Sequence, residues 1–200
     1  MTDLPLLPLP LAGEPASERS DAARNRAALL CSAQALVAQC GVEDVTMDAV
    51  AAHAGVGKGT VFRRFGSRAG LMVALLDQNE SHWQAQVISG PPPLGPDAPP
   101  WDRLEAFGRS RLETTILHGD LLRAAGAAGS RSAPAVTFVV QHVQHLLREL
   151  GVTGDVRLLA TALMAPLEIG VLDELRTKGI DTERVIHGWL DLARRIVGGC

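Results

Sequence analysis

The segment from Thr46 to Phe65, TMDAVAAHAGVGKGTVFRRF, constrains the fold more tightly than any other part of the chain. Thr46 suits an N-cap position, and apolar residues follow it at helical spacing as far as Ala54. Gly55 comes next, where a helix end commonly takes a left-handed residue. A second short segment then carries basic side chains around Val61. The pattern predicts two helices joined by a sharp turn.

The second of these helices has the composition of an element that reads DNA. A short cationic helix held against another across a glycine-containing turn suits the major groove. The apolar positions of this helix are expected to face inward, which leaves Lys58, Thr60 and Arg64 on or near the outward surface. Arg63 is expected towards the flank, and Arg64 is the expected phosphate contact. The alternative is an ordinary helical hairpin with a solvated basic end. The predicted DNA contacts are Thr46, Lys58, Gly59, Thr60, Phe62, Arg63, Arg64 and Arg68.

Several short motifs occur in order between about Arg24 and Leu76. They are Cys40-Gly41-Val42, Val45-Thr46-Met47-Asp48-Ala49-Val50-Ala51, Ala54-Gly55-Val56, Lys58-Gly59-Thr60-Val61-Phe62, and Phe65 followed by Ser67-Arg68 and Leu71. With these motifs the chain resembles the TetR family of bacterial transcriptional regulators. The resemblance implies a homodimer that binds a palindromic operator, usually represses, and is released by a small-molecule effector.

Three positions depart from the family's usual residues. Phe62 stands where the family often has a tyrosine that contacts phosphate, so packing is the expected role of Phe62. Arg64 stands where histidine is common and brings a permanent charge with five donors. Gly57 replaces a common serine, which removes one possible hydroxyl contact. The operator sequence therefore cannot be transferred from relatives.

Composition and charge agree with a helical DNA-binding protein. Hydrophobic residues make up 46% of the 200 residues, and no strong alternating strand pattern is present, so an all-α fold is expected. The chain has a net charge of −3, but residues 15–75 contain seven basic and five acidic side chains. This segment is therefore +2 and the remainder −5. Such an uneven distribution would orient the N-terminal part towards DNA.

The chain is expected to divide into three parts. Residues 1–18 are rich in proline and are predicted to be a disordered or loosely docked arm. Residues 19–66 form the predicted three-helix DNA-binding domain with its helix-turn-helix, and residues 67–200 form a larger helical domain for ligand binding and dimerisation. In that domain, Pro166 is expected to kink or split a helix over residues 155–178.

The last two helices expected in the chain, the one over residues 155–178 and the one that follows it, predict a subunit interface. Both are hydrophobic over more than one face, so pairing with a second subunit would bury them in an intermolecular four-helix bundle. The alternative is an ordinary core within one subunit. The residues predicted to lie in the dimer interface are Leu167, Val171, Val185, Trp189, Leu192 and Ile196.

A small-molecule pocket is expected between the helices of the larger domain, although core packing is an equal alternative for each candidate residue. The sequence does not indicate the ligand. The candidate lining residues are Trp83, Trp101, Phe107, Arg111, Phe138, His142, Met164 and Glu168.

Two other classes of function stay open. One is a ligand-binding or protein-interaction module without operator binding. The other is a small metal-dependent enzyme that uses His118, His142 and His145. No carboxylate or cysteine is spaced to complete a metal site, and no phosphate-binding loop or nucleophile motif is present, so we predict no metal, no cofactor and no enzyme activity.

Cysteine usage and hydropathy bear on the compartment. Cys31, Cys40 and Cys200 have neither metal-ligand nor redox-motif spacing, and Cys31 is expected in the core. Such usage suits a reducing cytoplasm. The apolar N-terminus lacks a basic region and is broken by prolines, so no signal peptide is predicted, and no run is long enough to span a membrane.

Overall fold

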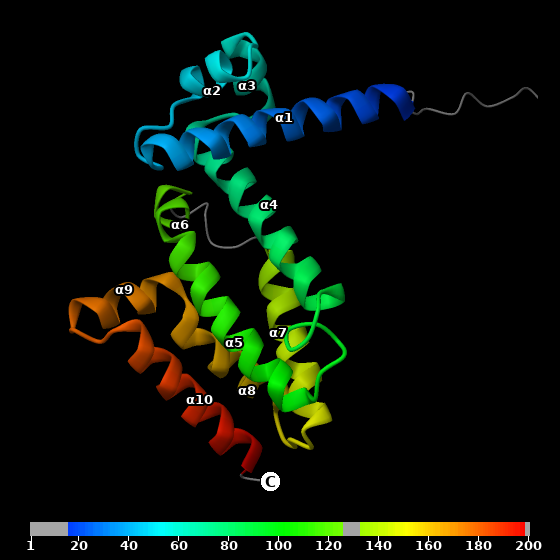
Figure 1. Ribbon diagram of the computed structural model, residues 1–200, viewed down its shortest axis with the longest axis vertical. Helices are drawn as coiled ribbons and strands as arrows, with labels where there is room; N and C mark the ends of the chain where they lie inside the picture. Colours follow the sequence, from blue (N-terminus) through cyan, green and yellow to red (C-terminus); the bar gives the residue numbers. More distant parts are fainter. Residues whose placement is uncertain (1–15, 126–132, 199–200) are drawn as a thin grey trace, which may run out of the picture.

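The computed structural model describes residues 16–125 and 133–198 (Figure 1). Within these ranges the chain forms α-helices, one short 3-10 turn and no strand, which confirms the predicted all-α fold. Residues 1–15 of the predicted arm lie outside the described residues, whereas residues 16–18 already belong to the first helix. Across both described ranges, no helix combines the length and the apolar character needed to cross a bilayer.

Three helices form the N-terminal unit at one end of the molecule (Figure 1). They are α1 (Ala16–Cys40), α2 (Met47–His53) and α3 (Lys58–Phe65). The apolar faces predicted from the helical spacing meet in a hydrophobic core that the beginning of the next helix and two residues farther along the chain, Leu121 and Ala125, complete. This core includes Leu30, Val45, Val50, Val61 and Leu71. Cys31 is exposed on α1, so its predicted place in the core is wrong.

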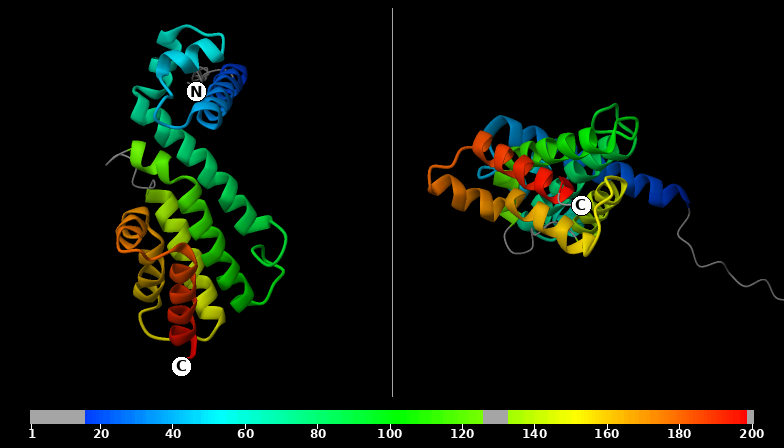
Figure 2. Two further views of the ribbon diagram at one scale, coloured as in Figure 1. Left: turned by 60° about the vertical axis from the view of Figure 1, so that its left-hand side comes forward. Right: turned by 90° about the horizontal axis from the view of Figure 1, so that it is seen from below.

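A single long helix, α4 (Arg68–Ser89), connects the N-terminal unit to the rest of the chain. Leu71 and Leu75, near its beginning, are buried in the N-terminal core. Trp83 and Val87, near its end, are buried in a second core formed by the C-terminal helices. Because α4 contributes to both cores, it ties the orientation of the N-terminal unit to the packing of the C-terminal helices (Figure 2).

The remaining helices form the body of the molecule. They are α5 (Pro100–Leu117), α6 (Gly119–Ala125), α7 (Ala133–Glu149), α8 (Val156–Met164), the 3-10 turn η2 (Ala165–Leu167), α9 (Ile169–Thr177) and α10 (Thr182–Gly198). The helix expected over residues 155–178 is split at Pro166, as predicted, because a proline cannot continue the hydrogen-bonded ladder.

Three of the six residues predicted to lie in the dimer interface are instead buried inside the subunit. Trp189 is only 2% exposed, and its indole nitrogen donates a hydrogen bond to the carbonyl oxygen of Leu163 at 2.6 Å. Its ring lies so close to Gly108 on α5 that a Cβ atom there would come within 2.2 Å of the indole. Val185 and Leu167 are also buried in this core. Trp189 thus holds α10 to α5 and α8, and none of the three side chains is available to a second subunit.

Candidate nucleic-acid interface

The turn between α2 and α3 is built by local interactions. Thr46 caps α2, because its hydroxyl oxygen accepts a hydrogen bond from the backbone N–H of Ala49 at 3.1 Å. Gly55 has a φ angle of +67°, in the left-handed region that glycine adopts at low cost. α3 then begins at Lys58 with Gly57 as its N-cap residue. The predicted helix-turn-helix is therefore present, and Thr46 acts in it as a capping residue.

The rotation of α3 is fixed by its apolar side. Val61 is completely buried and Phe65 is half-buried against the N-terminal core, as predicted. Gly57 and Gly59 lie on the open side, where a Cβ atom would meet nothing within 4 Å. This surface leaves room for another molecule to approach the backbone of the recognition helix α3.

Phe62 and Lys58 form one exposed patch on α3. Phe62 is 40% exposed, so its predicted packing role is wrong. The Lys58 ammonium lies 5.7 Å from the centre of the Phe62 ring and 2.7 Å from a carboxylate oxygen of Asp48. Both partners of this ion pair are more than half exposed, so the pair contributes little and can readily be exchanged for a contact with DNA.

The other basic residues of α3 and its flank differ in their surroundings. Arg64 is exposed and donates a hydrogen bond to the carbonyl oxygen of Ala22 at 2.9 Å, which turns it towards α1. Thr60 is partly exposed and lines a hollow between α1 and α3. Asn25 on α1, which the sequence pattern did not single out, lines the same hollow with Arg63 and Arg64.

Arg68 has a structural role that the sequence did not reveal. Its guanidinium donates hydrogen bonds to the carbonyl oxygens of Val45 at 2.9 Å, Val42 at 2.5 Å and Glu43 at 3.2 Å. These contacts fasten the segment before α2 to the first turn of α4. Because the guanidinium is occupied by the protein's own backbone, the predicted DNA contact of Arg68 is not supported by its geometry.

The predicted ligand pocket does not form from the candidate residues as a group. Phe107 and Met164 are buried in the body core, and Glu168 is exposed at the beginning of α9. Trp101 is half-buried, with the Arg194 guanidinium 5.8 Å from its ring centre. Ordinary packing accounts for Phe107 and Met164, whereas Glu168 lies on the surface.

His142 belongs to an aromatic cluster in the same core. Its ring stacks on Phe107 and Phe138, with ring centres 5.0 and 6.0 Å apart. Burial, with smaller contributions from Arg103 and His145, lowers the pKa of His142 to about 4. Within the described residues no group of three histidines, cysteines or carboxylates is placed to hold a metal ion, so His118 does not join this pair in a site.

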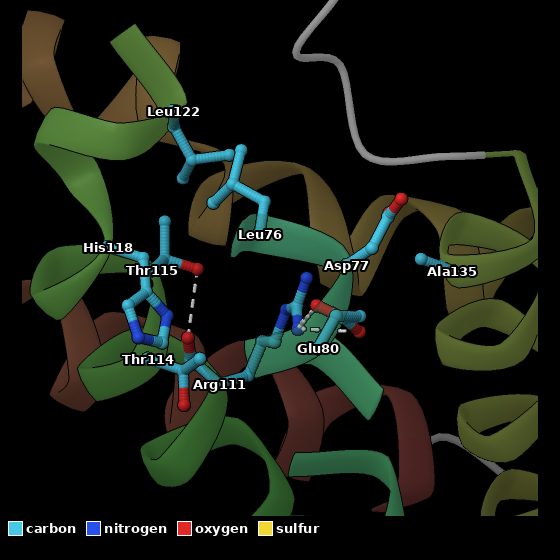
Figure 3. A pocket seen from close by; sticks show the side chains of 9 residues that line it. All are labelled: Leu76, Asp77, Glu80, Arg111, Thr114, Thr115, His118, Leu122 and Ala135. Atoms are coloured by element: carbon cyan, nitrogen blue, oxygen red, sulfur yellow. Dashed lines mark hydrogen bonds and ion pairs between the residues drawn. The ribbon is translucent and has the colours of Figure 1, made fainter. Parts of the chain in front are cut away.

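Two of the candidates line hollows: Trp83 lines a groove beside α4, and Arg111 lines an adjoining cavity. The cavity, of about 20 Å³, lies between α4, α5, α6 and α7 (Figure 3). Arg111 is completely buried and its Nη1 donates to both carboxylate oxygens of Glu80, at 2.8 and 3.1 Å. Its guanidinium carbon lies 4.6 Å from the centre of the Trp83 ring. The full lining is Leu76, Asp77, Glu80, Arg111, Thr114, Thr115, His118, Leu122 and Ala135.

The comparison with protein families matches the same segment that the motifs singled out. Residues 29–75 match the family model described as bacterial regulatory proteins, tetR family. The fold agrees over a much longer range: a TetR-family transcriptional regulator from Pectobacterium atrosepticum superimposes with a TM-score of 0.69, at 24% identity, over 90% of this chain and 96% of that one. The predicted TetR resemblance is confirmed.

Two other solved structures share the fold over most of the chain. A TetR-like regulator from Rhodococcus sp. RHA1 has a TM-score of 0.56 at 21% identity, covering 88% of this chain and 97% of its own. BioQ, solved with its double-stranded DNA operator, has a TM-score of 0.62 at 17% identity, covering 86% and 98%. No curated protein sequence matches the chain. The family model and the TetR-like fold together indicate a DNA-binding transcriptional regulator.

Proposed function

We propose that the protein is a dimeric repressor that binds a palindromic operator through α3 and is released by a small molecule. The observation that carries the proposal is the exposed side of the recognition helix. There Lys58, Phe62 and Arg63 stand beside two glycines whose surroundings are open. Residues 19–66 would be the DNA-binding domain and residues 67–200 the domain for dimerisation and effector binding.

The side chains of α3 would contact either bases or phosphates, depending on their position on the helix. Lys58 and Thr60 are proposed to contact bases, and Arg63 to contact phosphate from the exposed flank. Arg64, held towards α1, is proposed to contact phosphate at the edge of the groove. Losing a phosphate contact weakens binding to all sequences and lowers the magnitude of the log–log salt slope by roughly 1, whereas losing a base contact relaxes specificity at one position.

Dimerisation is proposed through the outer faces of α8 and α10. These two helices contact each other, and each exposes a large apolar side chain to solvent. Leu158 on α8 is 64% exposed and Leu192 on α10 is 37% exposed. Ala162 and Gly188 are also exposed on these helices and would allow close approach of a second copy. Of the originally predicted interface residues, Leu192, Val171 and the half-buried Ile196 remain on the surface.

The dimer is tested by replacing Leu158 and Leu192 together with glutamate. Both side chains are on the surface of the subunit, so the fold should survive while charge prevents association. Sedimentation is expected to show a folded monomer. Ile88→Glu is the matched control, because Ile88 is 61% exposed on α4, away from α8 and α10. An intact dimer from the double variant would place the interface elsewhere.

The DNA-binding function is tested by selecting and sequencing the genomic fragments that the purified protein retains. A shared inverted repeat is expected, with half-sites separated by about 34–36 Å or a multiple of that distance. Retention of no fragment above background would favour the alternative of a ligand-binding module that does not recognise an operator.

A further inference from the structure

The buried guanidinium of Arg111 keeps one edge without a partner. Nη1 is bonded to Glu80, but Nε and Nη2 find no hydrogen-bond acceptor among the described residues. Buried donors are normally satisfied, because leaving one without an acceptor costs its full desolvation. The side chain is nevertheless completely buried and lines a cavity. Two unused donors at such a place indicate a missing acceptor.

The geometry of the two donors narrows the kind of acceptor. Nε and Nη2 form one side of the planar guanidinium, and such a pair of parallel N–H groups matches the two oxygens of a carboxylate. Figure 3 shows the terminal nitrogen that does not bind Glu80 turned away from that residue, towards the side of the cavity between Leu76 and Asp77. The Asp77 carboxylate itself points away from the guanidinium in this view.

We propose that Arg111 binds the carboxylate of a small amphipathic acid, and that this acid is the effector. The inference rests on the proposed function, since it names the class of molecule that would release the repressor. Leu76, Leu122 and Ala135 supply an apolar lining beside the guanidinium. The lining pairs an apolar wall, suited to an aliphatic or aromatic body, with the Arg111 cation as the anchor. Asp77 and Glu80 also line the cavity, so the acid would have to displace the Glu80 carboxylate from Arg111.

The cavity as it stands has room for about one water molecule, so a carboxylate would enter it only as the Glu80 side chain gives way. A larger groove of about 430 Å³ adjoins it, because Thr114 and His118 line both spaces. Trp83 is the apolar part of its lining, and the other lining residues are polar: Gln34, Gln78, Asn79, His82 and Gln86. The body of the acid would extend past the two shared side chains into the groove and lie along α4.

Binding would loosen the connection between α4 and α5. Glu80 forms the ion pair between α4 and Arg111, and Trp83 of the same helix packs its ring against the guanidinium. An incoming carboxylate would place a second negative charge beside that guanidinium. Like charges at such short range repel, and the repulsion is strong where water is excluded. The effector would thus compete with Glu80 for Arg111. The competition predicts that removing the charge of Glu80 strengthens acid binding.

The test follows the Nε–H resonance of Arg111 in protein labelled with ¹⁵N-arginine. Butyrate, hexanoate and benzoate are titrated beside their amides, which have the same shape without the charge. The acids are expected to shift this resonance and to bind at least about tenfold more tightly than the amides. Glu80→Gln should raise the affinity for the acids severalfold, an effect that a merely structural ion pair would not produce.

Two further variants locate the site. Arg111→Gln alone would remove the counter-charge of the largely buried Glu80, leaving only a hydrogen bond from Gln84, and could unfold the protein, so Glu80→Gln is combined with it. The neutral pair should fold and should lose the preference for acids. Arg109→Gln is the control, because Arg109 lies on the same helix, is exposed and pairs with Glu105. This variant should bind the acids as the parent does.

The outcomes separate the inference from the proposed function. If the protein binds its operator and no acid moves the Arg111 resonance or discriminates against its amide, the inference is wrong and the regulator stands. If acids bind at Arg111 but operator affinity stays unchanged at saturation, the effector role is wrong. If no operator is bound at all, the proposed function fails, while the titration still decides the site.

Discussion

Replacement of Arg68 by alanine should destabilise the protein without removing a contact to DNA. The guanidinium satisfies three backbone carbonyls in the segment before α2, two of them at 2.9 Å or less. A hydrogen bond to a charged group contributes about 1.5–3 kcal/mol, and the Arg68 side chain keeps only 33% of its surface exposed. Counting the two shorter bonds and discounting for this exposure, we expect a loss of about 2–4 kcal/mol in the free energy of unfolding.

Arg63→Ala is the matched comparison for this experiment. Arg63 is exposed on α3, so its removal should leave the free energy of unfolding within about 0.5 kcal/mol of the parent value. It should reduce the magnitude of the log–log salt slope of DNA binding by roughly 1, as expected for a lost phosphate contact. Arg68→Ala should leave that slope unchanged, because the residue does not contribute its charge to phosphate.

The measurements are urea unfolding followed by circular dichroism, and fluorescence anisotropy on a selected operator at several salt concentrations. The reasoning would be refuted by an Arg68→Ala protein of parental stability whose salt slope is smaller by about 1. That result would return Arg68 to the DNA contacts predicted from the sequence. The free energy of unfolding of Arg68→Lys should lie between those of the parent and of Arg68→Ala, because a single ammonium reaches fewer of the carbonyls.

Three further predictions concern stability and redox behaviour. The pKa of His142 is lowered from 6.5 to about 4, so on acidification the unfolded state takes up a proton before the folded state does. After allowance for partial exposure, the free energy of unfolding should fall by about 1–2 kcal/mol between these pH values. His142→Leu should lose this pH dependence, and His145→Leu should keep it. Gly108→Ala should destabilise the body by about 1–3 kcal/mol in thermal or urea unfolding, because the new methyl group would overlap the buried indole of α10. Serine at Cys31 and Cys40 should leave operator affinity and the free energy of unfolding unchanged, since both side chains are exposed, and a clear loss of either would contradict this prediction. If the parent protein responds to oxidant and the variant does not, these cysteines have a redox role.

Local signals were sufficient to predict the helix-turn-helix. A cap at Thr46, a left-handed glycine at position 55 and the apolar spacing around Val61 each act over a few residues, so they can be identified in the sequence. The role of Arg68 could not be found in this way. The carbonyls that it binds lie 23 to 26 residues earlier in the chain, and no spacing rule connects an arginine with such groups.

The apolar spacing in α10 shows a different limit of prediction from sequence. Its periodicity correctly indicated a buried face, but periodicity does not identify the surface that covers it. Trp189 is covered by α5, because Gly108 leaves the space that an indole ring needs. A glycine 81 positions earlier gives no sign of its partner in the sequence. The same applies to Glu80 and Arg111, which are brought together only when α4 packs against α5.

The position of Glu80 along α4 determines how a change at the cavity could reach DNA. Glu80 lies twelve residues beyond Arg68, where α4 begins, which corresponds to about 18 Å along a helix. A tilt of about 10° around Glu80 would move the beginning of α4 by about 3 Å. Arg68 holds the segment before α2 to that first turn, so the N-terminal unit would follow the movement. In a dimer the two displacements add, and a change of this size exceeds the tolerance of hydrogen bonds to two half-sites fixed on one duplex. Loss of the Arg111–Glu80 ion pair would thus produce a large displacement at the beginning of α4, because a rigid helix separates the two places. A similar tilt around a residue near the beginning of α4 would hardly move the N-terminal unit.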